Sequence, residues 1–143
     1  MPSGRSNLEN LARAKQLNAE PPVRAEIDGL LKRARSQLGD ARNPELNITS
    51  RFTLAYGAAH TLALAALRNA GYRPSSAGHR KVVFQTLDTT VGAAPELWVA
   101  LDRYHDKRNR HEYEGADIST LEVEDMINLT DQLEALVIKR LQK

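Results

Sequence analysis

The chain has 143 residues, of which 41% are hydrophobic and only 5% aromatic; this is the size of one domain and a composition that favours closely packed helices over sheets. It contains no cysteine, which excludes disulfide bonds, thiolate metal sites and a cysteine nucleophile. The formal net charge of +2 is far below that of a protein that coats DNA, so the total charge does not identify a partner.

The first residues, MPSGRSNLEN, lack the apolar core of a signal peptide. No uninterrupted apolar stretch is long enough to span a bilayer. We therefore expect residues 1–143 to form a single domain of a cytoplasmic protein that does not enter the membrane.

Two helices are predicted before residue 45. Leu8 and Leu11 indicate a short helix within residues 1–21, which ends before a proline pair. Whether this helix packs in the bundle or lies at its periphery stays open at this point. From Pro22 to the breaker Asn43-Pro44, apolar residues recur at helical spacing and the opposite face is charged. This pattern predicts a longer second helix with one face in water.

The third predicted helix, residues 51–71, is rich in alanine and leucine and is expected to be the centre of the bundle. Thr49 or Ser50 is the expected N-cap, and Gly71 is the expected stop. After a predicted turn at residues 72–76, residues 78–92 favour a short fourth helix, with a strand as the alternative because of their β-branched residues.

The last two helices have clear boundary signals. Pro95 suits the first turn of the fifth helix, and Gly115 suits its end. Ser119 and Glu122 have the spacing of a capping box at the start of the sixth helix. The chain is therefore predicted to be all-α, with five to six helices.

The fifth helix carries polar groups on its apolar side. Successive residues advance by about 100° around a helix axis, so one narrow stripe consists of Leu97, Leu101, Tyr104, Arg108 and His111. On a neighbouring side, expected to face solvent, the same geometry collects Arg103, Lys107 and Arg110, while His105 flanks the stripe. An apolar stripe thus ends in a cation and an imidazole, beside a basic surface.

Arg108 needs a partner, because a buried unpaired guanidinium is costly. In one interpretation it pairs with Glu112 on the next turn, or with an acid of another helix, and has a structural role. In the other it lies in a polar pocket at a contact between subunits. Both interpretations stay open at this point.

The segment RYHDKRNRHEY places an Arg-Asn pair before a Glu-Tyr pair, late on the fifth helix. It follows the stretch from Ser50 to Leu87, in which a helix, a Gly-Tyr-Arg-Pro turn and a His-Arg helix start succeed one another. In this order and spacing, the chain from about residue 22 to about residue 140 resembles the HEPN superfamily of higher eukaryotic and prokaryotic nucleotide-binding domains.

This resemblance implies an up-and-down helical bundle that pairs into a homodimer. Members of the superfamily are often encoded beside a nucleotidyltransferase, or act as RNA-cleaving toxins that have an antitoxin partner. The resemblance therefore implies RNA or a nucleotide, and one of these two proteins, as partners. No cofactor is expected, and no metal site is predicted, because His105 and His111 lack the four-residue spacing of paired helical ligands. The resemblance also implies a site on the fifth helix, for which we expect RNA or nucleotide binding by Arg103, His105, Lys107, Asn109, Arg110 and Tyr113.

Active members of the superfamily carry an Arg, a polar residue, and a His a little more than one turn further on. Arg108 and Asn109 match the first two, but the position five residues after Arg108 is Tyr113, and His111 comes after only three. Cleavage through the ribose 2′-OH needs a group that exchanges protons near neutral pH, which His does and an unperturbed Tyr does not.

Arg108 and His111 are accordingly the tentative catalytic pair of a metal-independent endoribonuclease, with Arg108 stabilising phosphate charge. The leading prediction is a binding or assembly domain. The alternatives are the endoribonuclease of a toxin–antitoxin module and a purely structural or protein-interaction module.

Overall fold

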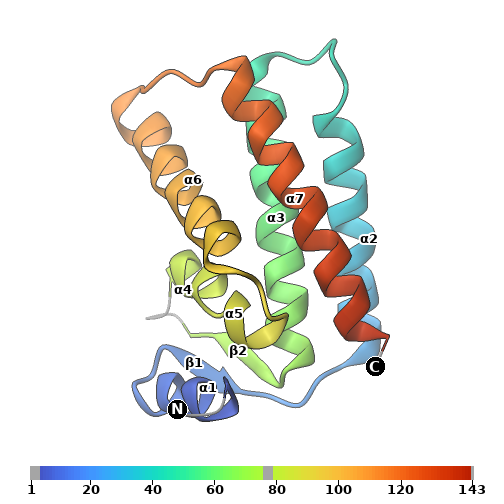
Figure 1. Ribbon diagram of the computed structural model, residues 1–143, viewed down its shortest axis with the longest axis vertical. Coiled ribbons are helices and arrows are strands. Elements are labelled where there is room, and N and C mark those ends of the chain that lie inside the picture. Colours follow the sequence, from blue (N-terminus) through green and yellow to red (C-terminus); the bar gives the residue numbers. More distant parts are fainter. Residues whose placement is uncertain (1–3, 76–78, 143) are drawn as a thin grey trace.

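The computed structural model describes residues 4–75 and 79–142, and within these residues the chain forms seven helices and one two-stranded sheet (Figure 1). The helices are α1 (Gly4–Arg13), α2 (Arg24–Ala41), α3 (Ile48–Asn69), α4 (His79–Gln85), α5 (Leu87–Thr90), α6 (Pro95–Glu114) and α7 (Thr120–Leu141). The strands are β1 (Leu17–Ala19) and β2 (Tyr72–Pro74). The predicted all-α class is confirmed, with a small sheet added to it.

Helix α3 is the centre of the bundle, as predicted. It contacts α2 and α7, and also α4, α5 and α6 (Figure 1). Alanines and leucines at most of its positions let these neighbours approach on several sides at once, and most of its length is buried. The four long helices α2, α3, α6 and α7 alternate in direction along the chain, which makes the bundle up-and-down (Figure 1).

Most helix boundaries agree with the local signals in the sequence. Gly115 ends α6 with the left-handed backbone φ of 72° that favours glycine. Ser119 and Glu122 form the expected capping box at the start of α7. The predicted cap of α3 was wrong: Asn47 is the N-cap, and its side chain accepts a hydrogen bond from the Ser50 amide at 2.8 Å. Ser50 therefore lies inside the first turn, as a donor to the cap.

Residues 79–90 are helical, so the alternative of a strand was wrong there. The single helix expected in this region is divided into α4 and α5 at Thr86, whose hydroxyl donates to the Val83 carbonyl at 3.1 Å. The strands lie elsewhere. β1 and β2 pair antiparallel, with Leu17 opposite Pro74, and β2 occupies part of the predicted turn. Strands of three residues are too short to show a period in the sequence.

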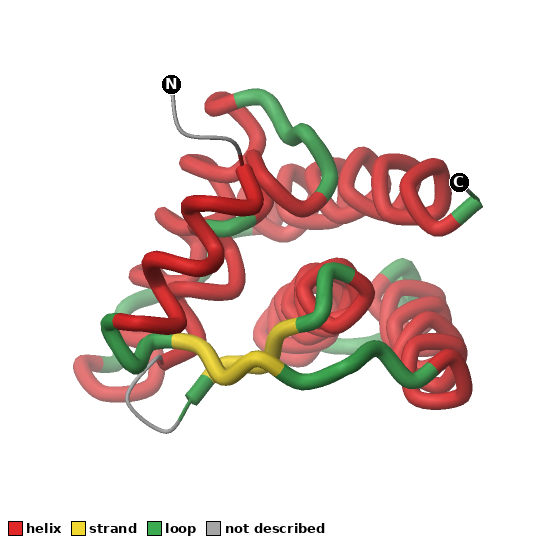
Figure 2. Tube along the Cα trace, turned by 90° about the horizontal axis from the view of Figure 1, so that it is seen from below, coloured by secondary structure: helices red, strands yellow, loops and turns green. Residues whose placement is uncertain are grey.

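The N-terminal segment is joined to the bundle and is not peripheral. Leu8 of α1 and Leu17 of β1 belong to the main hydrophobic core. Figure 2 shows α1 and the two strands lying across one end of the bundle, where β1 reaches β2. This segment therefore covers the end of α3 opposite the α6–α7 connection (Figure 1).

A charged network holds this arrangement together around Arg68 of α3, which is completely buried. The Arg68 guanidinium donates to the carbonyl oxygens of Pro21 at 2.9 Å and Glu20 at 3.0 Å, and it pairs with the Glu26 carboxylate. Arg73 of β2 pairs with the same two acids, at 2.8 Å to Glu20 and 2.7 Å to Glu26. Charges on α2, α3, β2 and the β1–α2 connection thus compensate one another.

None of the helices in the described ranges has both the length and the apolar character needed to cross a lipid bilayer.

Candidate functional site

Helix α6 has an anchored half and a polar half. Its buried residues, Leu97, Ala100, Leu101 and His105, all lie before residue 106. From residue 106 to its end at Glu114, every residue is exposed or only half-buried. The anchored half packs beside α4 and α5, whereas the polar half leads to the short connection into α7. The residues predicted to form a site are concentrated on this polar half.

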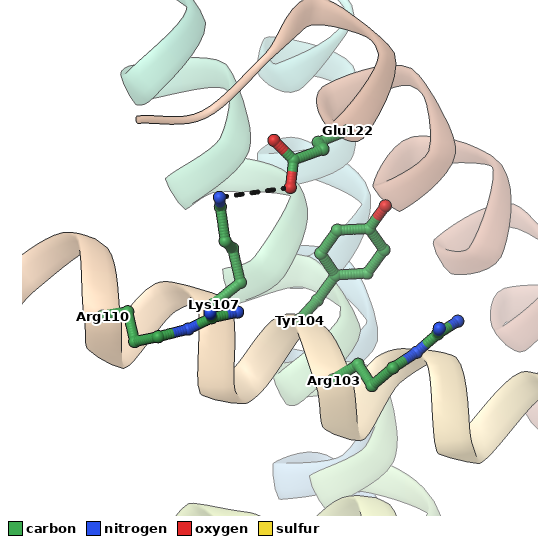
Figure 3. A pocket seen from close by; sticks show the side chains of 5 residues that line it. All are labelled: Arg103, Tyr104, Lys107, Arg110 and Glu122. Atoms are coloured by element: carbon green, nitrogen blue, oxygen red, sulfur yellow. Dashed lines mark ion pairs between the residues drawn. The ribbon is translucent and has the colours of Figure 1, made fainter. Parts of the chain in front are cut away.

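Between α6 and α7 there is an open pocket with a volume of about 250 Å³ (Figure 3). Its lining residues are Arg103, Tyr104, Lys107 and Arg110 from α6 and Glu122 from the first turn of α7. Three of the predicted RNA- or nucleotide-binding residues therefore surround one cavity. Arg103 and Arg110 are exposed, whereas Lys107 is half-buried and reaches across to Glu122 with 3.5 Å between Nζ and Oε2 (Figure 3).

Tyr104 forms a wall of this pocket. Its hydroxyl donates to Asp125 of α7 at 2.7 Å, and its ring meets the ring of Phe52 edge-on with 5.9 Å between centroids. Burial, and then the hydrogen bond to Asp125, raise the pKa of Tyr104 well above its usual value. Tyr104 is therefore a neutral, firmly held side chain at physiological pH and not a proton acceptor.

Glu122 is a fixed carboxylate at the edge of the pocket. Its Oε1 accepts from the Ser119 amide at 2.9 Å, which completes the capping box, and its Oε2 faces Lys107. Burial raises the pKa of Glu122, but hydrogen bonding with Ser119 and the charge of Lys107 outweigh it and bring that pKa below the ordinary value of 4.5. The pocket thus contains three cations and one carboxylate at neutral pH.

Arg108 lies on another side of α6, against α3. Its guanidinium pairs with Glu112 at 3.0 Å, as one interpretation of the sequence expected, and lies over the Tyr56 ring with 5.1 Å to the centroid. Its side chain is 21% exposed, so the cation is half-buried with two partners. Arg108 is therefore separated from the cations of the pocket.

His105 and Asn109 accompany Arg108. The Tyr56 hydroxyl and His105 Nδ1 share a hydrogen bond of 2.9 Å, and His105 Nε2 is 3.4 Å from the amide nitrogen of Asn109. His105 is 8% exposed. The structure thus places this predicted binding residue in the interior behind Arg108, where it does not line the pocket.

His111 and Tyr113 occupy the end of α6. His111 Nδ1 lies 2.6 Å from the carbonyl oxygen of Ala116, and because a carbonyl only accepts, this nitrogen carries the proton. Tyr113 is 83% exposed. Among the described residues no hydrogen bond or ion pair joins Arg108 to His111, so the tentative catalytic pair stays a prediction.

No group of three or more acidic or histidine side chains in the described part of the chain is arranged to hold a metal ion. Comparison of the chain with models of known protein families, with curated proteins and with solved structures finds no match. The resemblance to the HEPN superfamily accordingly remains an expectation from the sequence. The class established here is an all-α bundle with a basic pocket between its last two helices.

Two residues that line the pocket, Tyr104 and Glu122, were not predicted to belong to the site. Tyr104 was assigned to the core-facing stripe, and Glu122 was recognised only as part of a capping box. A signal was present, since the connection between residues 114 and 120 is short, and short connections place consecutive helices side by side. The first turn of α7 therefore had to lie near the polar half of α6.

Proposed function

We propose that this protein is an RNA- or nucleotide-binding module that works as a homodimeric, HEPN-like binding or assembly domain. The observation that carries the proposal is that Arg103, Lys107 and Arg110 surround one open pocket. Phosphate is the group that such a set of cations attracts most strongly, and contacts to phosphate account for most of the affinity of proteins for nucleic acids.

One further feature supports a nucleic acid ligand. The exposed ring of Tyr113 stands on the same helix end and is available to stack on a base. A ligand that contacts both the pocket and this ring follows the polar half of α6.

Self-association is the second part of the proposal. Leu121 at the start of α7 is a large apolar residue that is 77% exposed. A side chain of this kind is stabilised when a second chain covers it, which makes it a suitable anchor for an interface. A nucleotidyltransferase or an antitoxin, the partners implied by the resemblance, is proposed as a further partner of the dimer.

RNA binding is tested by fluorescence anisotropy with a short labelled RNA and the double variant Arg103→Gln/Arg110→Gln. We expect the affinity to fall at least about tenfold. The slope of log affinity against log salt concentration should become shallower by about two, because two phosphate contacts are lost. The matched control is Arg24→Gln/Arg35→Gln, which removes two exposed cations from α2 on the other side of the bundle. Equal losses in the two double variants would contradict the proposal.

A metal-independent endoribonuclease is the second candidate, and one observation favours it. The hydrogen bond from His111 Nδ1 to Ala116 holds the imidazole in the form whose Nε2 accepts protons, as in many general bases. Incubation with mixed RNA in a chelator tests it. Cleavage should disappear in both Arg108→Ala and His111→Ala, and cleavage that persists in either variant would reject this function.

The structural alternative makes a different prediction for Arg108→Ala. If Arg108 serves only its contacts with Glu112 and Tyr56, the variant loses thermal stability while its binding of RNA and its self-association stay unchanged.

A further inference from the structure

We propose that the α6–α7 pocket is a site for a terminal phosphate, a phosphomonoester at the end of an RNA chain or on a free nucleotide, and that Glu122 limits which anions enter it. This inference rests on the proposed binding function and specifies the ligand chemistry of the same pocket.

Charge balance is the first argument. Arg103, Lys107 and Arg110 bring three positive charges to the pocket, and Glu122 brings one negative charge, so two positive charges remain. A phosphomonoester carries a charge of about −1.5 to −2 at neutral pH, whereas an internal phosphodiester carries a single negative charge. The pocket therefore matches a terminal phosphate better than a link within the chain.

Size is the second argument. A volume of about 250 Å³ lies just below the roughly 300–1,000 Å³ of pockets that enclose a whole small-molecule ligand. It accommodates a phosphate and the sugar that follows it, and leaves the base outside. The Tyr104 ring offers an apolar wall to that sugar, because its hydroxyl is already bound to Asp125.

The pairing of Lys107 with Glu122 is the third argument. The carboxylate is held in place by the Ser119 amide, so it remains at the edge of the pocket when an anion approaches. The Lys107 ammonium lies 3.5 Å from it at the end of a flexible stem, and can turn to a phosphate instead. Any ligand must compete with Glu122 for this ammonium, and a doubly charged phosphate attracts the ammonium more strongly than a singly charged diester does.

The first test compares two RNA oligonucleotides of one sequence, labelled at the 3′ end, that carry either a 5′-phosphate or a 5′-hydroxyl. The wild type should bind the phosphorylated form about tenfold more tightly, as expected for one additional charge-assisted contact. Lys107→Gln should abolish this preference while retaining the thermal unfolding temperature of the wild type. Competition by a nucleoside 5′-monophosphate at a similar concentration would identify free nucleotides as the source of the phosphate.

The second test uses Glu122→Gln, which keeps the capping box because glutamine also accepts from the Ser119 amide. Only the charge is lost, so the affinity for the 5′-phosphorylated RNA should rise about threefold or more. Glu124→Gln is the matched control: it makes the same change of charge on α7, two residues away and on an exposed position outside the pocket. A Glu122→Gln variant that binds no more tightly than this control would overturn the role given to Glu122.

The outcomes separate this inference from the proposed function. If both RNAs bind equally well and Arg103→Gln/Arg110→Gln weakens both, the terminal-phosphate site is overturned while RNA binding stands. If the wild type binds no RNA, the proposal of RNA binding fails. Calorimetric titration with a nucleoside 5′-monophosphate then tests whether the pocket binds a terminal phosphate. Binding that Lys107→Gln removes supports the site, and no binding overturns it.

Discussion

Arg68 takes a positive charge into the interior of the bundle, where an unpaired charge would be very unfavourable. It is tolerated because carbonyl oxygens of residues 20, 21 and 72 and the carboxylates of Glu20 and Glu26 surround it. The network also determines where the β1–α2 connection lies, since its backbone carbonyls bind the guanidinium directly. A single residue thus holds the N-terminal segment to α3.

Replacing Arg68 by Met should lower the free energy of unfolding by about 3 kcal/mol, because buried carbonyl oxygens and Glu26 lose their donor. Urea denaturation measures this change. Arg24→Met is the control, since Arg24 makes an exposed pair with Asp28 and its loss should cost at most about 0.5 kcal/mol. Similar values for the two variants would show that the network has no special importance.

The same network should make the free energy of unfolding depend on pH under acidic conditions. The hydrogen bond from Arg73 lowers the pKa of Glu20, and those from Arg68 and Arg73 lower the pKa of Glu26, from ordinary values of 4.5. Because the folded values lie below the unfolded ones, the stabilisation is complete above about pH 4.5 and is lost as the pH falls through the folded values.

We therefore expect the urea midpoint to fall as the pH is lowered below about 4.5, and to fall less in Glu26→Gln than in the wild type. Glu124→Gln, at an exposed position of α7, serves as the control for removing a carboxylate. An unchanged pH dependence in Glu26→Gln would mean that Glu26 has the same pKa in the folded and unfolded chains.

At the scale of elements, the α6–α7 hairpin places the candidate site. Gly115 ends α6 in a left-handed conformation, and the capping box at Ser119 starts α7 a few residues later. The connection between them is therefore short and defined by local chemistry. This brings Glu122 to Lys107, and the capping hydrogen bond then keeps the carboxylate there.

The same substitution should have opposite effects at two glycines. Gly115→Ala should destabilise the protein by about 1 kcal/mol, because a side chain is strained at a φ of 72°. Gly29→Ala, in the exposed interior of α2 with nothing close to the added methyl group, should stabilise it by roughly 0.5–1 kcal/mol. Thermal unfolding of the two variants measures both signs, and destabilisation of equal size at both positions would contradict this account.

For the whole molecule, the distribution of apolar surface bears on assembly. Leu121 is exposed at the end of the bundle that has the α6–α7 connection, whereas at the opposite end α1 and the two strands lie against the end of α3 (Figure 1). The end with the α6–α7 connection is therefore where we expect a second copy to bind.

Sedimentation velocity over a range of concentrations should detect a dimer of the wild type. Leu121→Ser should weaken this dimer by about tenfold or more, because burying a leucine side chain at an interface contributes about 1.5–3 kcal/mol. Val23→Ser removes a half-exposed apolar residue just before α2 and should leave the dimer unchanged. A wild type that stays monomeric at all concentrations would contradict the homodimer.

The fold was largely predictable because its signals are local. Pro95, Gly115 and Ser119 act within one helical turn, so the bounds of α6 and the start of α7 followed from them. The N-cap of α3 was misplaced because Asn47, Thr49 and Ser50 are all good capping residues and stand close together. The division of α4 from α5 at Thr86 and the three-residue strands had no periodic signal.

The sequence by itself determined the long helices, the central place of α3 and the basic character of α6, because periodicity, caps and charge spacing depend on residues a few positions apart. Only the tertiary structure decided that β1 pairs with β2, that Arg68 is buried among Glu20, Glu26 and backbone carbonyls, and that Lys107 meets Glu122. Such contacts join different elements, and which partners meet depends on how the helices pack together and not on spacing along one of them.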